Sequence, residues 1–306
     1  MKYANILATF FSQAWAILPE KYAEIRAFLR LKANGGEVSA EQIAAIAGAR
    51  RTDGVQMLGR VAVLPVMGVI SQRVSMMDRA SGGVSTEEIG QTLDSLVADK
   101  QVSSIVMAFD SPGGSVSGLP ELAAKIRAAR DQKKIIGLAD SMAASAAYWL
   151  ISQTSEVVVT PSGQVGSIGV IAAHDDITGA LEQMGVKTTL ITSAPHKAEL
   201  YPESQLSDEA RADMQAKVDK YHAMFVADIA AGRGITSRAV EKNFGGGRML
   251  LAKDALAAGM VDKIATGEQL LSKLASAAGA KAETREPGLE ARLRERIARA
   301  VEVETA

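Results

Sequence analysis

Residues 135–149, which read IIGLADSMAASAAYW, combine a strand pattern, a helix pattern and a serine between small residues. The run 135–139 is apolar throughout, as expected of a strand that is buried on both faces. The run 143–150 is typical of a helix with an apolar face, and the side chains around Ser145 are too small to cover its hydroxyl. A serine at a helix start lies beside backbone N–H groups that have no partner within the helix. The stretch therefore predicts a strand-to-helix turn that either presents a reactive hydroxyl or only packs a helix closely on a sheet.

The composition limits the class of protein. The chain has 306 residues, 47% of them hydrophobic and 23% charged, so it can bury a sizeable core. The 34 Lys and Arg nearly balance the 35 Asp and Glu, so the overall charge favours neither nucleic acid nor an anionic membrane as a partner. The absence of cysteine excludes disulfides, thiol catalysis and thiolate metal sites. Only three histidines are present, so we expect neither a metal nor a cofactor.

Strand and helix patterns alternate along the middle of the chain. Ser85 and Glu88 form a capping box at the start of one of the helices. Alternation of this kind indicates βαβ units and a mainly parallel sheet, in which sites lie where strands end and helices begin. Strands are predicted at 61–70, 104–109, 135–139, 156–159, 186–192 and 261–264, and helices include 143–150, 175–184, 208–231 and 252–258.

The two ends differ from this middle part. Residues 3–18 have the outline of an export signal, but polar residues interrupt the apolar run, so we expect a short amphipathic helix that reaches Pro19. Helices at 20–32 and 39–48 complete a helical arm at 1–55, before a main domain at 56–270. Residues 271–306 are rich in Ala, Glu and Arg and are predicted to be a charged tail, helical or disordered. No stretch reaches the roughly 18 uninterrupted apolar residues of a membrane span.

A glycine turn follows the predicted strand 104–109. It reads Asp110-Ser111-Pro112-Gly113-Gly114, and it lacks the lysine and the spacing of a phosphate-binding P-loop. Two adjacent glycines allow backbone N–H groups to approach a ligand closely, as an oxyanion hole requires. A tight structural turn explains the same residues equally well, so the turn does not by itself decide the function.

A serine nucleophile needs a base, commonly a histidine held by a carboxylate. His174, His196 and His222 are available, but none has the context of a known triad, and we favour a structural or exposed role for each. A lysine in an apolar pocket can also lose its proton and act as the base. Lys197 lies in a short loop before a long helix, although nothing local distinguishes it from the other basic residues.

Four segments taken in order decide between these alternatives, because together they resemble the signal peptide peptidase A family of serine peptidases. They are Asp110–Gly114, Ala143–Trp149, Gly166–Val170 and Ser193–Lys197. The likeness spans roughly 61–264, about two thirds of the chain, and the N-terminal arm is most similar to the phage branch of capsid-assembly or head-maturation proteases. The resemblance implies a Clp/crotonase-like βαβ superhelix with a mainly parallel sheet, within the α/β class.

The resemblance also implies the roles of individual residues. Ser145 would be the nucleophile and Lys197 the base of a Ser/Lys dyad, and the N–H groups of Ala146 and of Gly113 or Gly114 would bind the oxyanion. Many family members have Ser-Gly-Gly where this chain has Ser145-Ala146-Ala147. Alanine retains the N–H group, so we expect activity to survive this departure. The shape of the S1 pocket, which holds the side chain before the scissile bond, is less defined.

These implications lead to a specific expectation of function. We expect a serine endopeptidase that cleaves phage capsid, scaffold or portal proteins, or its own chain, during procapsid maturation in the host cytoplasm. It would act as a homo-oligomer, without nucleic acid and without a membrane span. Two other enzymes remain as alternatives: a host-type signal peptide peptidase, which would need access to membranes, and a crotonase-like acyl-CoA enzyme, which would share the fold and the oxyanion hole. A scaffold protein with a decayed site is the non-enzymatic alternative.

Overall fold

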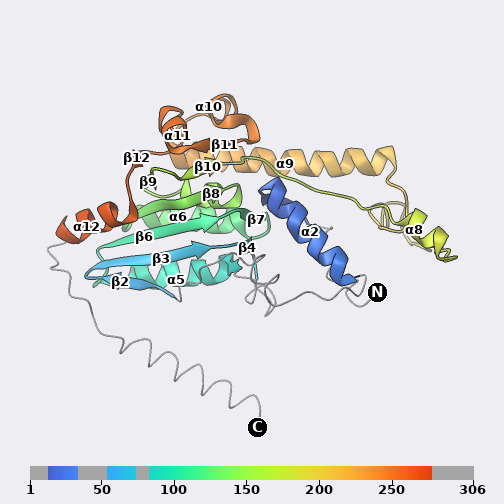
Figure 1. The fold of residues 1–306 in the computed structure, drawn as a ribbon, viewed down its shortest axis with the longest axis horizontal. Helices are drawn as coiled ribbons and strands as arrows, with labels where there is room; N and C mark the ends of the chain where they lie inside the picture. The colour runs from blue at the N-terminus through green and yellow to red at the C-terminus, as the bar shows by residue number, and fades with distance from the viewer. Residues whose placement is uncertain (1–12, 34–53, 74–82, 278–306) are drawn as a thin grey trace, which may run out of the picture.

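The computed structural model describes residues 13–33, 54–73 and 83–277. The strands within these ranges form two sheets, one of eight strands and one of four (Figure 1). The central pairs of the larger sheet are parallel, and helices connect its strands. The structure thus confirms the α/β class and the mainly parallel sheet predicted from the sequence.

The larger sheet has the order β11-β10-β8-β6-β3-β2, with β9 paired to β8 and β12 paired to β9. One edge of β8 pairs with β6, while the other pairs first with β9 and then, through its last residues, with β10. The sheet therefore divides beside the carboxyl end of β8. The bounds of its strands are β2 (Gln56–Leu58), β3 (Val61–Met67), β6 (Ser104–Ser111), β8 (Lys134–Ala144), β9 (Glu156–Val159), β10 (Gln164–Gly166), β11 (Met249–Leu251) and β12 (Lys263–Ile264).

The smaller sheet has the order β1-β7-β4-β5. Its strands are β1 (Trp15–Ile17), β7 (Gly113–Ser115), β4 (Ile70–Ser71) and β5 (Val84–Ser85). β7 follows directly after β6 of the larger sheet, and it pairs antiparallel with β1 and parallel with β4. The glycine turn predicted from the sequence is therefore a strand with a neighbour on each side.

Helices cover both faces of the larger sheet. α5 (Thr86–Ala98), α6 (Leu119–Arg130), α7 (Ala146–Ile151) and the end of α9 (Asp208–Arg233) pack in succession around the main core. Ser85 accepts a hydrogen bond from Glu88 N–H, which confirms the predicted cap of α5. α12 (Gly267–Ala277) contributes Leu270 to a second cluster that includes residues of β3, β6, β8 and β9. The remaining helices are α2 (Pro19–Ala33), α8 (Thr178–Gln183), α10 (Ser237–Asn243), the short 3-10 helix η1 (Gly245–Gly247) and α11 (Ala252–Ala257).

The long helix α9 is buried along only part of its length. Phe225 and Ile229 are fully buried, whereas Tyr221 is 37% exposed. The first half of α9 extends past the sheets, and the segment that carries α8 runs out alongside it (Figure 1). We call residues 172–207 the arm, a segment separate from the N-terminal arm predicted at 1–55. The helix predicted at 208–231 is thus confirmed, and its C-terminal end packs on the core while most of its N-terminal half does not.

Several sequence-based expectations are corrected by the structure. No strand forms at 186–192, where Ile191 is 96% exposed, because no neighbouring strand is available to pair with this apolar run. Residues 15–17 form β1 and not the end of a helix, and α7 begins at Ala146 because 143–144 complete β8.

The predicted helix 39–48 and most of the tail lie outside the described residues, and the domain boundaries at 55 and 270 stay predictions. Among the described residues, no helix combines the length and apolar character that crossing a membrane requires.

Candidate active site

Ser145 occupies a sharp turn between β8 and α7. Its backbone has φ 52° and ψ −112°, outside the regions that residues with a side chain prefer. The other non-glycine residues with positive φ in the described part of the chain are Ser141 and Ser167. Ser141 lies in β8 and Ser167 follows β10, so all three strained residues surround one end of neighbouring strands. Backbone strain of this kind costs about 1–3 kcal/mol per residue and is concentrated at functional sites.

Backbone hydrogen bonds hold this turn in place. Ser145 N–H donates to the carbonyl of Gly166 over 2.7 Å, and Trp149 N–H donates to the carbonyl of Ser145 over 2.9 Å. The Ser145 hydroxyl makes a long contact of 3.5 Å with the carbonyl of Gly169, and the residue has no exposed surface. Residues Gly166–Gly169, which belong to the segment Gly166–Val170 that resembles the peptidase family, therefore form one wall of the site.

The helix after Ser145 is anchored through its aromatic residues. The Tyr148 hydroxyl donates to the carbonyl of Met260 over 2.9 Å, and Trp149 Nε1 donates to Asp228 Oδ2 over 2.8 Å. The Trp149 ring stacks on Phe225 with the ring centroids 4.4 Å apart. Complete burial raises the pKa of Tyr148 far above its usual value, so its hydroxyl remains a neutral donor. The end of α9 thus fixes α7, and with it the position of Ser145.

The glycine turn lies at the same end of the sheet. β6 and β8 are neighbours, and Asp110 and Ser111 pair with Met142 and Ala143, just before Ser145. β7 packs against α7. The structure therefore brings Gly113 and Gly114 to the same edge as Ser145 and Ala146, as the sequence predicted.

Neighbouring backbone atoms lie so close to positions 113 and 114 that only glycine fits at each. Gly113 has φ 105°, and a Cβ atom there would lie 2.3 Å from the carbonyl oxygen of Ala16. A Cβ atom on Gly114 would lie 1.8 Å from the carbonyl oxygen of Ile70. Gly113 N–H donates to Ser111 Oγ over 3.2 Å within the turn.

Lys197 is not brought to this site within one copy of the chain. It is exposed in the arm between α8 and α9, and no hydrogen bond or ion pair of its side chain is found among the described residues. The histidines do not take its place. In the described part of the chain, no hydrogen bond joins a histidine to Ser145: His174 Nε2 lies 3.1 Å from the carbonyl of Ser204, and His222 lines a cavity of about 230 Å³ beside Ile168.

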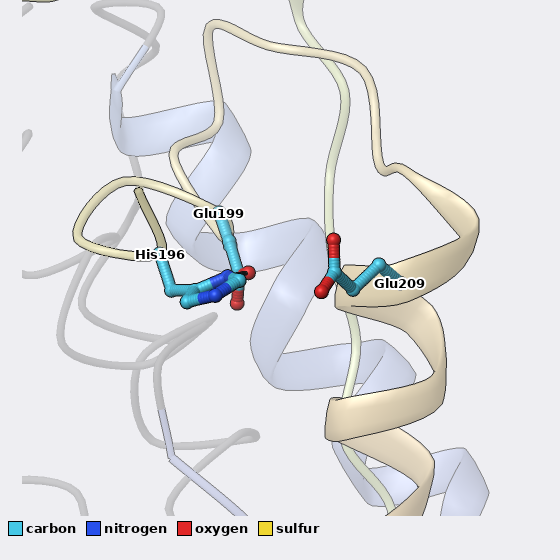
Figure 2. A group of neighbouring side chains, drawn as sticks. All are labelled: His196, Glu199 and Glu209. Carbon is cyan, nitrogen blue, oxygen red and sulfur yellow. Dashed lines mark hydrogen bonds and ion pairs between the residues drawn. The ribbon is translucent and has the colours of Figure 1, made fainter. Parts of the chain in front are cut away.

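Next to Lys197 the arm carries a cluster that sequence analysis did not identify. His196 Nδ1 pairs with a carboxylate oxygen of Glu199, and the hydrogen bond between them raises the pKa of His196 above its usual value. Figure 2 shows the carboxylate of Glu209, in the first turn of α9, turned toward this pair. One ligand-type atom from each of the three residues lies within 4.8 Å of the others, a spacing from which a metal ion could be held. The i, i+3 spacing of His196 and Glu199 is a signal in the sequence, whereas the approach of Glu209 depends on the fold.

A strained serine at a strand-to-helix junction, with glycine N–H groups at the same sheet edge, is the type of turn on which serine-dependent α/β hydrolases present their nucleophile. Comparison of the sequence independently assigns the chain to a family of peptidases. The model of Peptidase family S49 matches residues 127–281, about half of the chain, and the chain belongs to this family.

Individual relatives agree with the family assignment. The chain is 32% identical to the capsid assembly protease C of Escherichia phage lambda, over 76% of this chain and 53% of that protein. It is 33% identical to the head-tail preconnector protein GP5 of Enterobacteria phage P21, over 76% of this chain and 46% of that protein. It is 27% identical to Protease 4 of Salmonella typhi, over 73% of this chain and 35% of that protein. The chain thus spans about half the length of the two phage proteins.

A solved structure of the membrane-bound stomatin-specific protease 1510-N, in complex with a substrate peptide, is also similar. Its TM-score is 0.45 at 15% sequence identity, and the match covers 71% of this chain and 80% of that one.

Proposed function

We propose that this chain is a serine endopeptidase in which Ser145 is the nucleophile. The observation that carries the proposal is the strained backbone of Ser145, at the sheet edge where the glycine turn also lies. A fold holds a serine in such a conformation against a local cost, and the cost is understandable where the hydroxyl must be held toward a substrate carbonyl. Membership of Peptidase family S49 supports the same reaction class.

The reaction follows from the groups assigned to the site. Ser145 Oγ bonds to the scissile carbonyl carbon while the neutral amine of Lys197 takes its proton. The C–N bond then breaks as the lysine returns this proton to the leaving amine. Water, deprotonated by the same lysine, hydrolyses the resulting ester and restores Ser145. The N–H groups of Ala146 and of Gly113 or Gly114 bind the oxyanion, and each such donor typically contributes about 3 kcal/mol to transition-state stabilisation.

The base for this reaction comes, in our proposal, from a second copy of the chain. Lys197 is exposed on the arm, and the arm carries apolar side chains that face solvent, including Met184 at 74% and Ile191 at 96% exposure. Docking of the arm on a neighbouring copy would bury these side chains and bring Lys197 to that copy's Ser145.

The names of two relatives support a role in phage assembly. One is a capsid assembly protease and the other a head-tail preconnector protein. We propose that the substrates are phage capsid, scaffold or portal proteins, or this chain itself, and that cleavage occurs in the procapsid within the host cytoplasm. A host-type signal peptide peptidase would instead fractionate with membranes, and a crotonase-like enzyme would bind CoA thioesters and tolerate loss of Ser145.

The test is co-expression with the neighbouring capsid genes, comparing the wild type with Ser145→Ala and Lys197→Ala. Lys187→Ala, a change to another lysine of the arm, is the matched control. We expect cleavage of a capsid-gene product with the wild type and the control but not with the other two variants. Unchanged cleavage in both Ser145→Ala and Lys197→Ala would refute the dyad.

A further inference from the structure

The strand β1 pairs with one edge of β7, the strand that carries the two glycines of the candidate active site. Trp15, Ala16 and Ile17 stand opposite Ser115, Gly114 and Gly113 in an antiparallel register. On its other edge β7 pairs with β4. In the described part of the chain both edges of β7 are therefore occupied, and an extended substrate cannot add to this strand while β1 is in place.

The glycine N–H groups assigned to the oxyanion hole are engaged in this arrangement. Gly113 N–H donates to Ser111 Oγ. Leu18 N–H donates to the carbonyl of Pro112 over 2.9 Å, and Val116 N–H donates to the carbonyl of Ala14 over 3.0 Å. Hydrogen-bonded pairs alternate along an antiparallel ladder, so Ala16 and Gly114, midway between these two bonds, also form a bonded pair. The N–H of Gly114, which a substrate carbonyl would need, is thus already paired with β1.

The other edge of β1 reaches the wall of the site that contacts Ser145. Trp15 and Ile171 exchange two backbone hydrogen bonds, of 2.9 and 2.8 Å. Ile171 is two residues beyond Gly169, whose carbonyl contacts the Ser145 hydroxyl. β1 therefore bridges the glycine strand and the segment beside the nucleophile, and Ser145 has no exposed surface in this state.

The side chains of β1 belong mainly to a small cluster apart from the main core. Trp15 and Ile17 pack with Tyr22 of α2, which follows β1 directly and lies beside the sheets (Figure 1). Two arginines of α2, Arg26 and Arg30, pair with Asp175 just beyond Ile171. β1 and α2 form one unit that is held by this cluster, by the arginine pairs and by the backbone pairing of β1. Its one contribution from β1 to the main core is the small side chain of Ala16, so displacement of the unit would disturb that core little.

We propose that β1 is an internal ligand of the active site, which holds the peptidase inactive until the unit of β1 and α2 is displaced. This inference rests on the proposed function, since it assigns the regulation of the same site. The ligand class that competes with β1 is an extended peptide, which would add antiparallel to β7 between that strand and Ile171. Activity then depends on the fraction of molecules in which β1 has left.

A reversible disulfide tests this proposal, and the chain has no native cysteine that would interfere. Trp15 and Ser115 face each other at a non-hydrogen-bonded position, where Cα atoms are about 4.5 Å apart, within the range of about 4.4–6.8 Å for disulfides. The full chain carrying both Trp15→Cys and Ser115→Cys is assayed with an alanine-rich fluorogenic peptide, oxidised and then reduced. The two single variants and Ser145→Ala are the controls.

We expect at least about a tenfold loss of activity on oxidation of the double variant and full recovery on reduction, with no redox effect in the single variants. A second variant does not depend on the disulfide. Asp175→Asn weakens both arginine pairs and is expected to raise activity about two- to tenfold, whereas Asp176→Asn at the next residue, whose carboxylate bonds Thr178, leaves it unchanged.

The outcomes separate the inference from the function on which it rests. Equal activity of the oxidised and reduced double variant, with Ser145→Ala inactive, overturns the role of β1 and leaves the peptidase in place. So does an unchanged rate in Asp175→Asn. Cleavage by Ser145→Ala, or no cleavage by any variant, counts against the proposed function itself.

Discussion

Replacement of Ser145 by glycine is expected to stabilise the protein relative to replacement by alanine. Both changes remove the hydroxyl and its long contact with Gly169, so the comparison isolates the effect of a Cβ atom at φ 52° and ψ −112°. Relief of strain at such a residue contributes about 1–3 kcal/mol. Glycine also gives the unfolded chain more freedom, which costs about 0.5–1 kcal/mol. From the middle of each range, the net expectation is a free energy of unfolding about 1 kcal/mol higher for Ser145→Gly than for Ser145→Ala.

Urea denaturation measures this difference. With a slope of about 3 kcal/mol per M, the glycine variant should unfold at a urea concentration about 0.3 M higher than the alanine variant. Ser152, at the other end of α7, is the matched control because it is also fully buried but has φ −63°. There the alanine variant should be the more stable of the two. A Ser145→Gly protein no more stable than Ser145→Ala would refute the view that Ser145 is held under strain.

Two other perturbations test the packing and the electrostatics around the site. Gly114→Ala places a Cβ atom 1.8 Å from a backbone oxygen, so we expect loss of activity and at least about 2 kcal/mol of destabilisation. Gly169→Ala is the control, because a Cβ atom there meets open space and should change stability little in the same urea assay. Burial favours a higher pKa for Asp262, but hydrogen bonds from Arg233 and a backbone N–H prevail and lower this pKa below its usual 3.8. A depressed folded-state pKa means that Asp262 stabilises the fold above about pH 4 and that the contribution is lost as the pH falls further. Urea titrations should therefore show Asp262→Asn less stable than the wild type at pH 7, with the difference shrinking below pH 3.8; a constant difference would contradict this assignment.

Local signals predicted much of the larger sheet and the helices around it. The cap formed by Ser85 and Glu88 marked the start of α5, and alternating apolar runs and helix patterns marked β3, β6, β8 and their connections. The same signals fail where an element depends on a distant partner. β1 is three residues long and exists only because β7 and Ile171 pair with it, so no local pattern distinguishes it. The run 186–192 has the composition of a strand but meets no partner.

The candidate site shows the same division. Ser145 and the glycine turn could be placed together because the ends of neighbouring parallel strands share one edge of a sheet. The strain at Ser145 and its burial were not predictable, since both depend on how β10 and β1 close around the turn. Lys197 could be assigned only by resemblance, because it is exposed on the arm and no local pattern distinguishes it from the other basic residues.

The most direct test of the account is to mix two inactive variants. Purified Ser145→Ala keeps Lys197, and purified Lys197→Ala keeps Ser145. If each site takes its lysine from a neighbouring copy in a ring, random reassembly of an equal mixture creates complete dyads at about a quarter of the interfaces. We therefore predict that each variant alone is inactive toward a peptide substrate and that the reassembled mixture regains about a quarter of the wild-type activity. A mixture that stays inactive while reassembled wild type is active would contradict a dyad shared between copies, and activity in Lys197→Ala alone would contradict the dyad altogether.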